Sequence, residues 1–186
     1  MLLRFRTQRG GDVHNAGMGR WKPPSPKSSP YITAAGHQRL KQELKQLWID
    51  RREVVTAITA AAAEGDRSEN AEYIYRKKQL RETDRRIRYL SRRIDEVQPV
   101  ASLPAETGKV FFGAHVTVGE KGARPQRYRI VGADEIDPAR NWVSVDSPLA
   151  RALLGKGLGE CVDVETPAGP RALEILAVDY SGPPDS

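Results

Sequence analysis

The chain has 186 residues, of which 39% are hydrophobic and 29% are charged, and its formal net charge is +6. No apolar run approaches the roughly 20 residues that cross a bilayer, and the first six residues lack the apolar stretch of a signal peptide. The single cysteine excludes an internal disulfide and no CxxC or HxxxH spacing indicates zinc, so we predict a reduced, cytoplasmic protein without a membrane segment.

Residues 1–29 are predicted to form a disordered, basic arm rich in Pro, Ser, Gly and Arg. Residues 1–30 hold six Lys or Arg against one acidic residue, and their prolines remove backbone donors and disfavour a helix. Too few apolar residues are present to build a core. Met18, inside the arm, is an alternative start of the natural chain.

Residues 30–100 are predicted to form an antiparallel coiled-coil hairpin of two helices. The first helix begins after Thr33 as its N-cap and ends near Glu64 and Gly65, because Gly is the usual residue just past a helix end. Apolar residues recur in each helix with alternating gaps of three and four, the spacing of a coiled-coil seam, which Arg51 interrupts once. The first seam contains Leu40, Leu44, Leu47, Arg51, Val54, Ile58 and Ala61. The second seam contains Leu80, Thr83, Ile87, Leu90, Ile94 and Val97.

The predicted hairpin is a rod roughly 45 Å long, since each helix has about 30 residues and rises about 1.5 Å per residue. Its tip is residues 64–72, and three carboxylates fall within the seven residues 66–72, those of Asp66, Glu69 and Glu72. Oxygen ligands suit Mg²⁺, but so few carboxylates cannot hold it tightly unless a partner supplies the remaining ligands. The alternative is structural, because Asp66 and Glu69 have the spacing of a capping box and acids offset the dipole at a helix N-terminus. The residues alone favour capping.

A stripe of basic residues is predicted on the outer face of the second helix. This basic stripe consists of Lys78, Arg81, Arg85, Arg88 and Arg92. Outer faces of coiled coils are usually charged and solvated, and Asp84 is an i,i+4 partner for Arg88. A stripe of one sign on a projecting rod also suits phosphates or an acidic groove, so both interpretations stay open. Aromatic residues do not alternate with the stripe, which argues against base stacking.

After a linker at residues 101–108, residues 109–182 are predicted to form a small antiparallel β-sheet that holds one helix. Ser147 as N-cap and Pro148 at the first helical position begin this helix. The strands are short β-rich runs bounded by turn residues. These runs are residues 110–112, 115–118, 128–131, 142–145, 162–164 and 173–176.

The charge differs between the two parts. Residues 31–100 hold fifteen Lys or Arg against eleven acids, whereas residues 101–186 hold nine against twelve. A basic front and an acidic rear indicate an acidic partner for the front, either nucleic acid, anionic lipid or an acidic protein. His14, His37 and His115 are scattered, and no GxSxG, P-loop or dinucleotide fingerprint occurs. We therefore predict a binding or delivery protein rather than an enzyme.

Long motifs in the hairpin and beyond it carry a resemblance. They are residues 65–73, 77–78, 81–90, 108–114, 129–132, 146–154 and 166–169. Over roughly residues 31–180 the chain closely resembles the bacterial transcript-cleavage factors of the Gre family. Arg67 and Ser68 at the tip, together with the dense basic helix, resemble the B type of that family rather than the A type.

The resemblance implies a coiled-coil N-terminal domain and an FKBP-like C-terminal domain. The C-terminal domain is implied to dock at the rim of the RNA polymerase secondary channel, while the hairpin passes down it toward the 3′ end of the nascent RNA. A transcription elongation factor of this kind stimulates the polymerase to cleave backtracked RNA and rescues arrested complexes. It has no nuclease activity of its own, and we expect a monomer.

The resemblance also implies roles at the tip. Asp66 and Glu69 match the family's functional acids, which help to hold the second, weakly bound Mg²⁺ of the polymerase and to position water against the RNA; no tightly bound cofactor is expected. Arg67, Ser68 and Asn70 are implied to orient the tip, and Glu72 is a weaker candidate. The basic stripe is expected to contact RNA or polymerase.

Three other functions stay open. The first is a secondary-channel regulator that does not promote cleavage. The second is a prolyl isomerase, which the implied FKBP-like fold suggests but the sparse aromatic content of residues 101–186 disfavours. The third is a general nucleic-acid-binding coiled coil, which predicts salt-sensitive DNA binding without polymerase.

Overall fold

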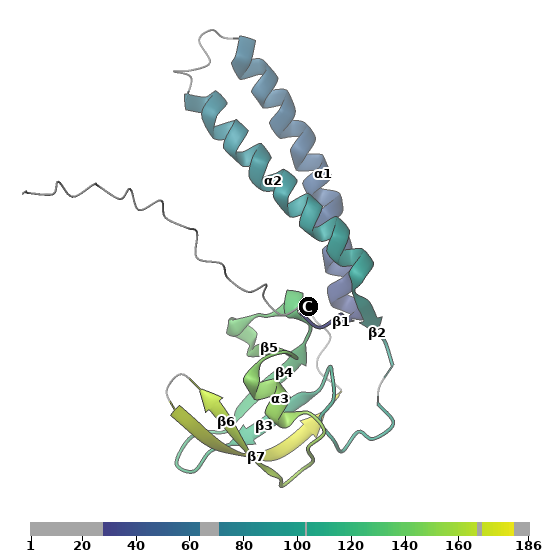
Figure 1. Ribbon diagram of the computed structural model, residues 1–186, viewed down its shortest axis with the longest axis vertical. Helices are drawn as coiled ribbons and strands as arrows, with labels where there is room; N and C mark the ends of the chain where they lie inside the picture. The colour runs from purple at the N-terminus through teal and green to yellow at the C-terminus, as the bar shows by residue number, and fades with distance from the viewer. Residues whose placement is uncertain (1–27, 64–70, 103, 167–168, 181–186) are drawn as a thin grey trace, which may run out of the picture.

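The computed structural model describes residues 28–63, 71–102, 104–166 and 169–180. A long helical hairpin stands on a small globular domain, in which a curled sheet wraps around one helix (Figure 1). This α+β architecture confirms the predicted hairpin and sheet domain. Residues 1–27, which form most of the predicted arm, lie outside the described residues. No helix in the described ranges is both long and apolar enough to span a membrane.

The hairpin consists of α1 (Ala34–Ala63) and α2 (Ala71–Glu96). The two helices pack side by side and antiparallel, and every member of the two predicted seams is at least partly shielded from solvent (Figure 1). Thr33 is the N-cap of α1 as predicted, because its Oγ1 accepts a hydrogen bond from the backbone N–H of Gly36 at 2.9 Å. The expected helix end at residues 64–65 lies outside the described residues.

Arg51, which interrupts the first seam, is accommodated by an ion pair between the two helices. Its Nε lies 2.7 Å from Oδ1 of Asp84 on α2. The predicted pairing of Asp84 with Arg88 along α2 is therefore wrong, because the carboxylate turns inward to the partly buried guanidinium. A long basic side chain is tolerated in the seam because its charge meets a partner at the seam's edge.

A two-stranded parallel sheet closes the base of the hairpin, and the sequence did not predict it. β1 (Tyr31–Thr33) precedes α1, and β2 (Gln98–Val100) follows α2. Ile32 of β1 is fully buried against the apolar base of the hairpin. Strands of three residues are too short to show the alternation that reveals longer strands.

The predicted disordered arm extends too far at its end. Ser29 was placed in the arm, but its backbone N–H donates to Oδ2 of Asp146 at 2.7 Å, and its carbonyl accepts from Arg93 at 2.9 Å. Ser29 is therefore tied to both parts of the molecule, since Arg93 belongs to α2 and Asp146 to the globular domain.

The globular domain contains one five-stranded sheet in the order β5-β4-β3-β7-β6. Its strands are β3 (His115–Gly119), β4 (Gln126–Val131), β5 (Trp142–Ser144), β6 (Cys161–Thr166) and β7 (Gly169–Asp179). The predicted antiparallel pairing holds except between β4 and β5, which are parallel. The chain can return to the same end of the sheet there because two short 3₁₀ turns, η1 (Ala133–Glu135) and η2 (Pro138–Arg140), separate the strands.

Residues 110–112, predicted as a strand, form part of a loop instead. The N–H of Val110 donates to the carbonyl of Lys156 at 2.8 Å, and its carbonyl accepts from the N–H of Gly155 at 2.8 Å. Val110 is fully buried, so its β-like character reflects a place in the core rather than in the sheet. The buried backbone of this loop is satisfied by the turn that follows the helix.

The helix α3 (Pro148–Leu153) lies in the hollow of the sheet (Figure 1). It begins as predicted, because Oγ of Ser147 accepts from the N–H of Ala150 at 3.1 Å and Pro148 occupies the first turn. Leu153 from α3 is fully buried among Val116, Ile130 and Ile175 of the sheet. One apolar core therefore holds the globular domain together.

Replacing Leu153 should destabilise the globular domain strongly, whereas replacing the nearby Leu158 should not. We expect Leu153→Ala to lower the free energy of unfolding by about 2–5 kcal/mol, because the vacated volume is closed on all sides. Leu158 is 69% exposed, so Leu158→Ala should change the free energy by about 0.5 kcal/mol or less. Urea unfolding of both variants checks this, and equal losses would contradict the described core.

Candidate functional site on the helical hairpin

The two helices of the hairpin are joined far from the globular domain. α1 ends at Ala63 and α2 begins at Ala71, both at the end of the rod that points away from the sheet (Figure 1). At about 1.5 Å per residue, the 30 residues of α1 place this end about 45 Å from the base. The predicted tip residues of the connection lie outside the described residues; they are Asp66, Arg67, Ser68, Glu69 and Asn70.

Glu72 is the predicted tip residue that the structure does describe, and it has a local partner. It lies in the first turn of α2, and its Oε1 is 3.3 Å from a guanidinium nitrogen of Arg76 one turn later. An acid in the first turn offsets the positive end of the helix dipole, and the i,i+4 pair adds a further small stabilisation. The contacts of Glu72 thus give it a structural role at the start of α2.

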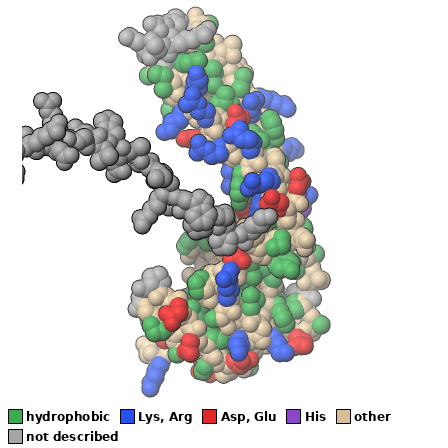
Figure 2. Space-filling view, viewed as in Figure 1, with side chains coloured by type: hydrophobic (Ala, Val, Ile, Leu, Met, Phe, Trp, Pro, Cys, Tyr) green, Lys and Arg blue, Asp and Glu red, His purple; other side chains and the backbone are tan. Residues whose placement is uncertain are grey.

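All five members of the basic stripe are exposed on α2. Lys and Arg side chains gather along the face of the hairpin that Figure 2 shows. Nε of Arg92 lies 3.5 Å from Glu96 on the same helix. Within the described residues, the other four members have no acid at ion-pair distance. Their charges are therefore mostly uncompensated and open to a partner.

Other arginines of the hairpin have a different task, because they hold the two helices together. Arg86 donates two hydrogen bonds to the carboxylate of Glu43 on α1, at 2.6 and 2.8 Å. The hydrogen bond to Glu43 raises the pKa of Arg86. Arg51 forms the second cross-hairpin pair, with Asp84. The structure thus distinguishes arginines that form ion pairs between the two helices from those of the basic stripe. The sequence pattern alone did not make this distinction.

A metal site on the rod was predicted only at the tip, through Asp66 and Glu69, and these residues are outside the described ranges. In the described part of the chain, no group of three or more His, Cys, Asp or Glu side chains is placed to hold a metal ion. The structure brings together a long rod and an outward basic face, and the sequence places Asp66 and Glu69 between the two helices of the rod.

Both parts of the chain match known family descriptions. "Transcription elongation factor, N-terminal" matches residues 30–98, and "Transcription elongation factor, GreA/GreB, C-term" matches residues 105–180. The chain belongs to the GreA/GreB family. The two matched ranges fall on the hairpin with its closing strands and on the globular domain, respectively.

Relatives of known name agree with this family. The chain is 55% identical to transcription elongation factor GreB of Xanthomonas axonopodis pv. citri over 88% of this chain and 99% of that protein. It is 54% identical to transcription elongation factor GreB of Pasteurella multocida, over 82% and 97% respectively. A solved GreA/GreB elongation factor from Nitrosomonas europaea is 16% identical, with a TM-score of 0.38 over 83% of this chain and 100% of that chain. The two matched family descriptions and the GreB relatives above 50% identity confirm the resemblance to the GreA/GreB family and to its B type.

The cross-hairpin pair of Arg51 and Asp84 should contribute a modest coupling energy to the rod of this GreA/GreB family member. We expect a double-mutant cycle with Arg51→Met and Asp84→Asn to give about 0.5–1 kcal/mol, because both side chains retain about a third of their exposure and the pair is partly screened by water. Thermal unfolding followed by helical circular dichroism measures each corner of the cycle. A coupling energy of zero would show that the two charges are independent.

Proposed function

We propose that this chain stimulates RNA polymerase to cleave backtracked nascent RNA, by passing its hairpin down the secondary channel while the globular domain docks at the rim. The observation that carries the proposal is the rod itself, in a chain of the GreA/GreB family. A projection of about 45 Å exceeds what a compact domain of this size requires, and its far end carries Asp66 and Glu69. Such a shape suits the delivery of side chains into a deep, narrow site.

The proposed division of labour leaves the chemistry with the polymerase. The donor set suits Mg²⁺, because carboxylate oxygens are its preferred protein ligands. Asp66 and Glu69 leave most positions around an octahedral ion unfilled, so the ion would be shared with acids of the polymerase. When bound, Mg²⁺ supplies an activated water and charge neutralisation at the leaving oxygen. The chain's own carboxylates attract the ion and orient water, and this chain is a factor rather than an enzyme.

The basic stripe is proposed to follow the extruded RNA or an acidic wall of the channel. Its five members are exposed along α2 and largely lack acidic partners among the described residues. Arg51 and Arg86, in contrast, form ion pairs with acids on the other helix of the rod. A one-sided row of cations raises the local concentration of a polyanion and slows its departure. The direction of the stripe along the rod would lead the RNA toward the tip.

The tip carboxylates should matter for chemistry rather than for docking. Asp66→Asn and Glu69→Gln retain shape and part of the capping ability but remove the charge that attracts Mg²⁺. If capping were their only role, each change should cost about 1 kcal/mol of helix stability and leave cleavage nearly intact. We expect cleavage of a halted, backtracked complex to fall by orders of magnitude while polymerase binding persists, with partial rescue at high Mg²⁺. Near-normal cleavage by the double variant at low Mg²⁺ would sink the metal-sharing mechanism.

Removing charge from the basic stripe should weaken cleavage more than removing equal charge from α1. We compare Lys78→Ala, Arg81→Ala and Arg85→Ala combined with a matched triple of Lys41→Ala, Lys45→Ala and Arg52→Ala, whose side chains are exposed on α1. The stripe variant should lose most activity on long backtracks, where more RNA reaches the rod. Its defect should be largest at low salt and shrink as salt screens the wild-type attraction.

The assay is RNA shortening from the 3′ end, measured against salt and backtrack length. Equal behaviour of the two triple variants would assign the stripe to a solvated face. If the chain bound free DNA but did not change RNA cleavage by the polymerase, a general nucleic-acid-binding coiled coil would be favoured.

A further inference from the structure

A buried carboxylate joins the globular domain to the base of α1. The side chain of Glu135, in the turn η1, is only 1% exposed. It accepts hydrogen bonds from the N–H of Thr33 at 2.9 Å and the N–H of Gly132 at 3.0 Å, and from the hydroxyl of Thr33. The guanidinium of Arg39 lies 3.5 Å away on the outer side. Thr33 is the N-cap of α1, so this carboxylate holds the residue from which the helix starts.

The preceding residue of the same turn holds the other helix. Nε of Arg93 on α2 lies 2.7 Å from Oδ2 of Asp134, and both side chains are only 8% exposed. The hydroxyl of Tyr89, one turn earlier on α2, donates to the same carboxylate. Burial, and then the hydrogen bond to Asp134, raise the pKa of Tyr89, which keeps this hydroxyl protonated as a donor. Two consecutive acids of the turn η1 therefore bind the two helices of the hairpin, Glu135 at the start of α1 and Asp134 on α2.

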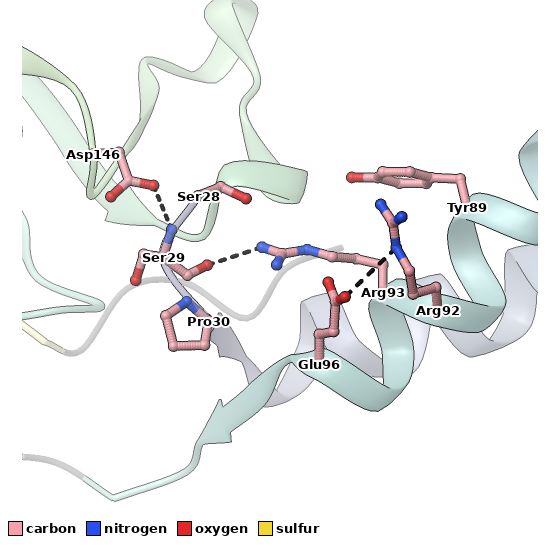
Figure 3. A pocket seen from close by; sticks show the side chains of 8 residues that line it. All are labelled: Ser28, Ser29, Pro30, Tyr89, Arg92, Arg93, Glu96 and Asp146. Carbon is pink, nitrogen blue, oxygen red and sulfur yellow. Dashed lines mark hydrogen bonds and ion pairs between the residues drawn. The ribbon is translucent and has the colours of Figure 1, made fainter. Parts of the chain in front are cut away.

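Ser29 spans the remaining opening between the rod and the globular domain. Figure 3 shows it between Arg93 and Asp146, in a crevice of about 770 Å³, with its carbonyl facing the guanidinium and its N–H facing the carboxylate. The hairpin base is thus held at three points, by Glu135, by Asp134 and by Ser29. These contacts will be called the joint.

The joint permits almost no space for an added side-chain atom. A Cβ placed on Gly36 of α1 would lie 2.1 Å from Oε1 of Glu135, and one placed on Gly132 would lie 2.5 Å from the carbonyl oxygen of Tyr31. The first contact is with the carboxylate that holds the start of α1, and the second is with the backbone of β1, so the turn η1 packs against the base of the hairpin as closely as glycine allows at these two positions. Close packing of the turn against this backbone limits tilting in a way that long surface side chains cannot.

The buried ion pair between Arg93 and Asp134 is weak evidence for stability, because the desolvation of both charges offsets much of their attraction. It does demand one geometry, since moving either partner leaves a charge buried without its counterpart. The rod multiplies any freedom at its base: a tilt of about 5° moves the end of a rod about 45 Å long by about 4 Å. Misplacement of a reacting group by about 1 Å costs about a hundredfold in rate. The direction of the rod therefore has to be set at the joint.

We propose that the joint is a positioning element, in which Glu135 and the Arg93–Asp134 pair fix the direction of the hairpin relative to the globular domain and so aim the segment that connects α1 to α2. The joint residues do not take part in the chemistry. Their contribution to cleavage rests on the proposed function, whereas their effect on the direction of the rod does not.

The direction of the rod can be measured in the free, full-length protein. Cys161 is exposed on β6 and is the single cysteine of the chain, so one added cysteine at the exposed Thr59 of α1 gives a pair of spin labels across the joint. We expect a narrow distance distribution by pulsed electron resonance. Glu135→Gln and Gly36→Ala should each broaden it, the first by removing the buried charge and the second by displacing the carboxylate.

Two comparisons separate positioning from folding. Gly36→Ala replaces the weaker helix former with the stronger one, so α1 should retain or gain helicity while the joint loosens. Arg51→Gln removes the arginine–aspartate pair inside the rod, and the side-chain contacts of Arg51, with Asp84 and Trp48, lie outside the joint. This control should leave the distance distribution unchanged.

The effect on function is tested by measuring the affinity for polymerase and the cleavage rate separately. At saturating factor, the cleavage rate with either joint variant should fall about tenfold or more, while the affinity for polymerase changes less than about threefold. Unchanged distance distributions in both joint variants would overturn the proposal, as would broadened distributions with a normal cleavage rate. If the wild-type chain failed to stimulate cleavage, the proposed function would fall and the distance distributions alone would decide whether the joint fixes the rod.

Discussion

A two-helix rod has a single apolar seam to hold it together, and this constraint shapes the rest of the molecule. The seam between α1 and α2 buries Leu40, Val54 and Leu90, but each helix leaves its other faces in water. The outer faces must then be polar, and the hairpin satisfies this with a surplus of Lys and Arg. Pairs such as Arg86–Glu43 supplement the seam from its edges. What remains unpaired on α2 is a row of positive charge that the fold itself does not use.

The same constraint explains why the rod needs a base. The described residues toward its far end pack through the seam, whereas its near end has β1, β2 and the turn η1 around it. Ile32 and Leu90 are fully buried there, and the charged contacts of Glu135 and Asp134 surround this small apolar cluster. The globular domain contributes little to the length of the rod and much to its orientation, since it supplies both acids from adjacent positions.

Periodic features of this fold could be read from the sequence, and features that depend on distant contacts could not. The alternating gaps of three and four revealed both helices, and a side-chain oxygen followed by proline revealed the start of α3. The burial of Glu135 could not be predicted from its neighbours in the sequence, because Asp134, Glu135 and Asp137 together are typical of an exposed polar turn. Likewise, the choice of Arg51 over Arg88 as the partner of Asp84 depends on the opposite helix. At the tip, Asp66 and Glu69 were assigned a role in cleavage by their resemblance to a family motif, since the residues alone favoured a helix cap.

The contact between Thr33 and Glu135 also sets an order of events during synthesis. The two residues are separated by 102 positions, and a bacterial ribosome adds about 5–20 residues per second. Helices form in about a microsecond or less, so α1 and α2 can close their seam long before residue 135 leaves the ribosome. From the end of α2 at Glu96 the ribosome has 39 residues to add before Glu135, so for about 2–8 s the newborn hairpin exists without the turn η1 at its base. A chaperone or the ribosome surface has this interval in which to meet the hairpin, and arrival of the turn η1 ends it.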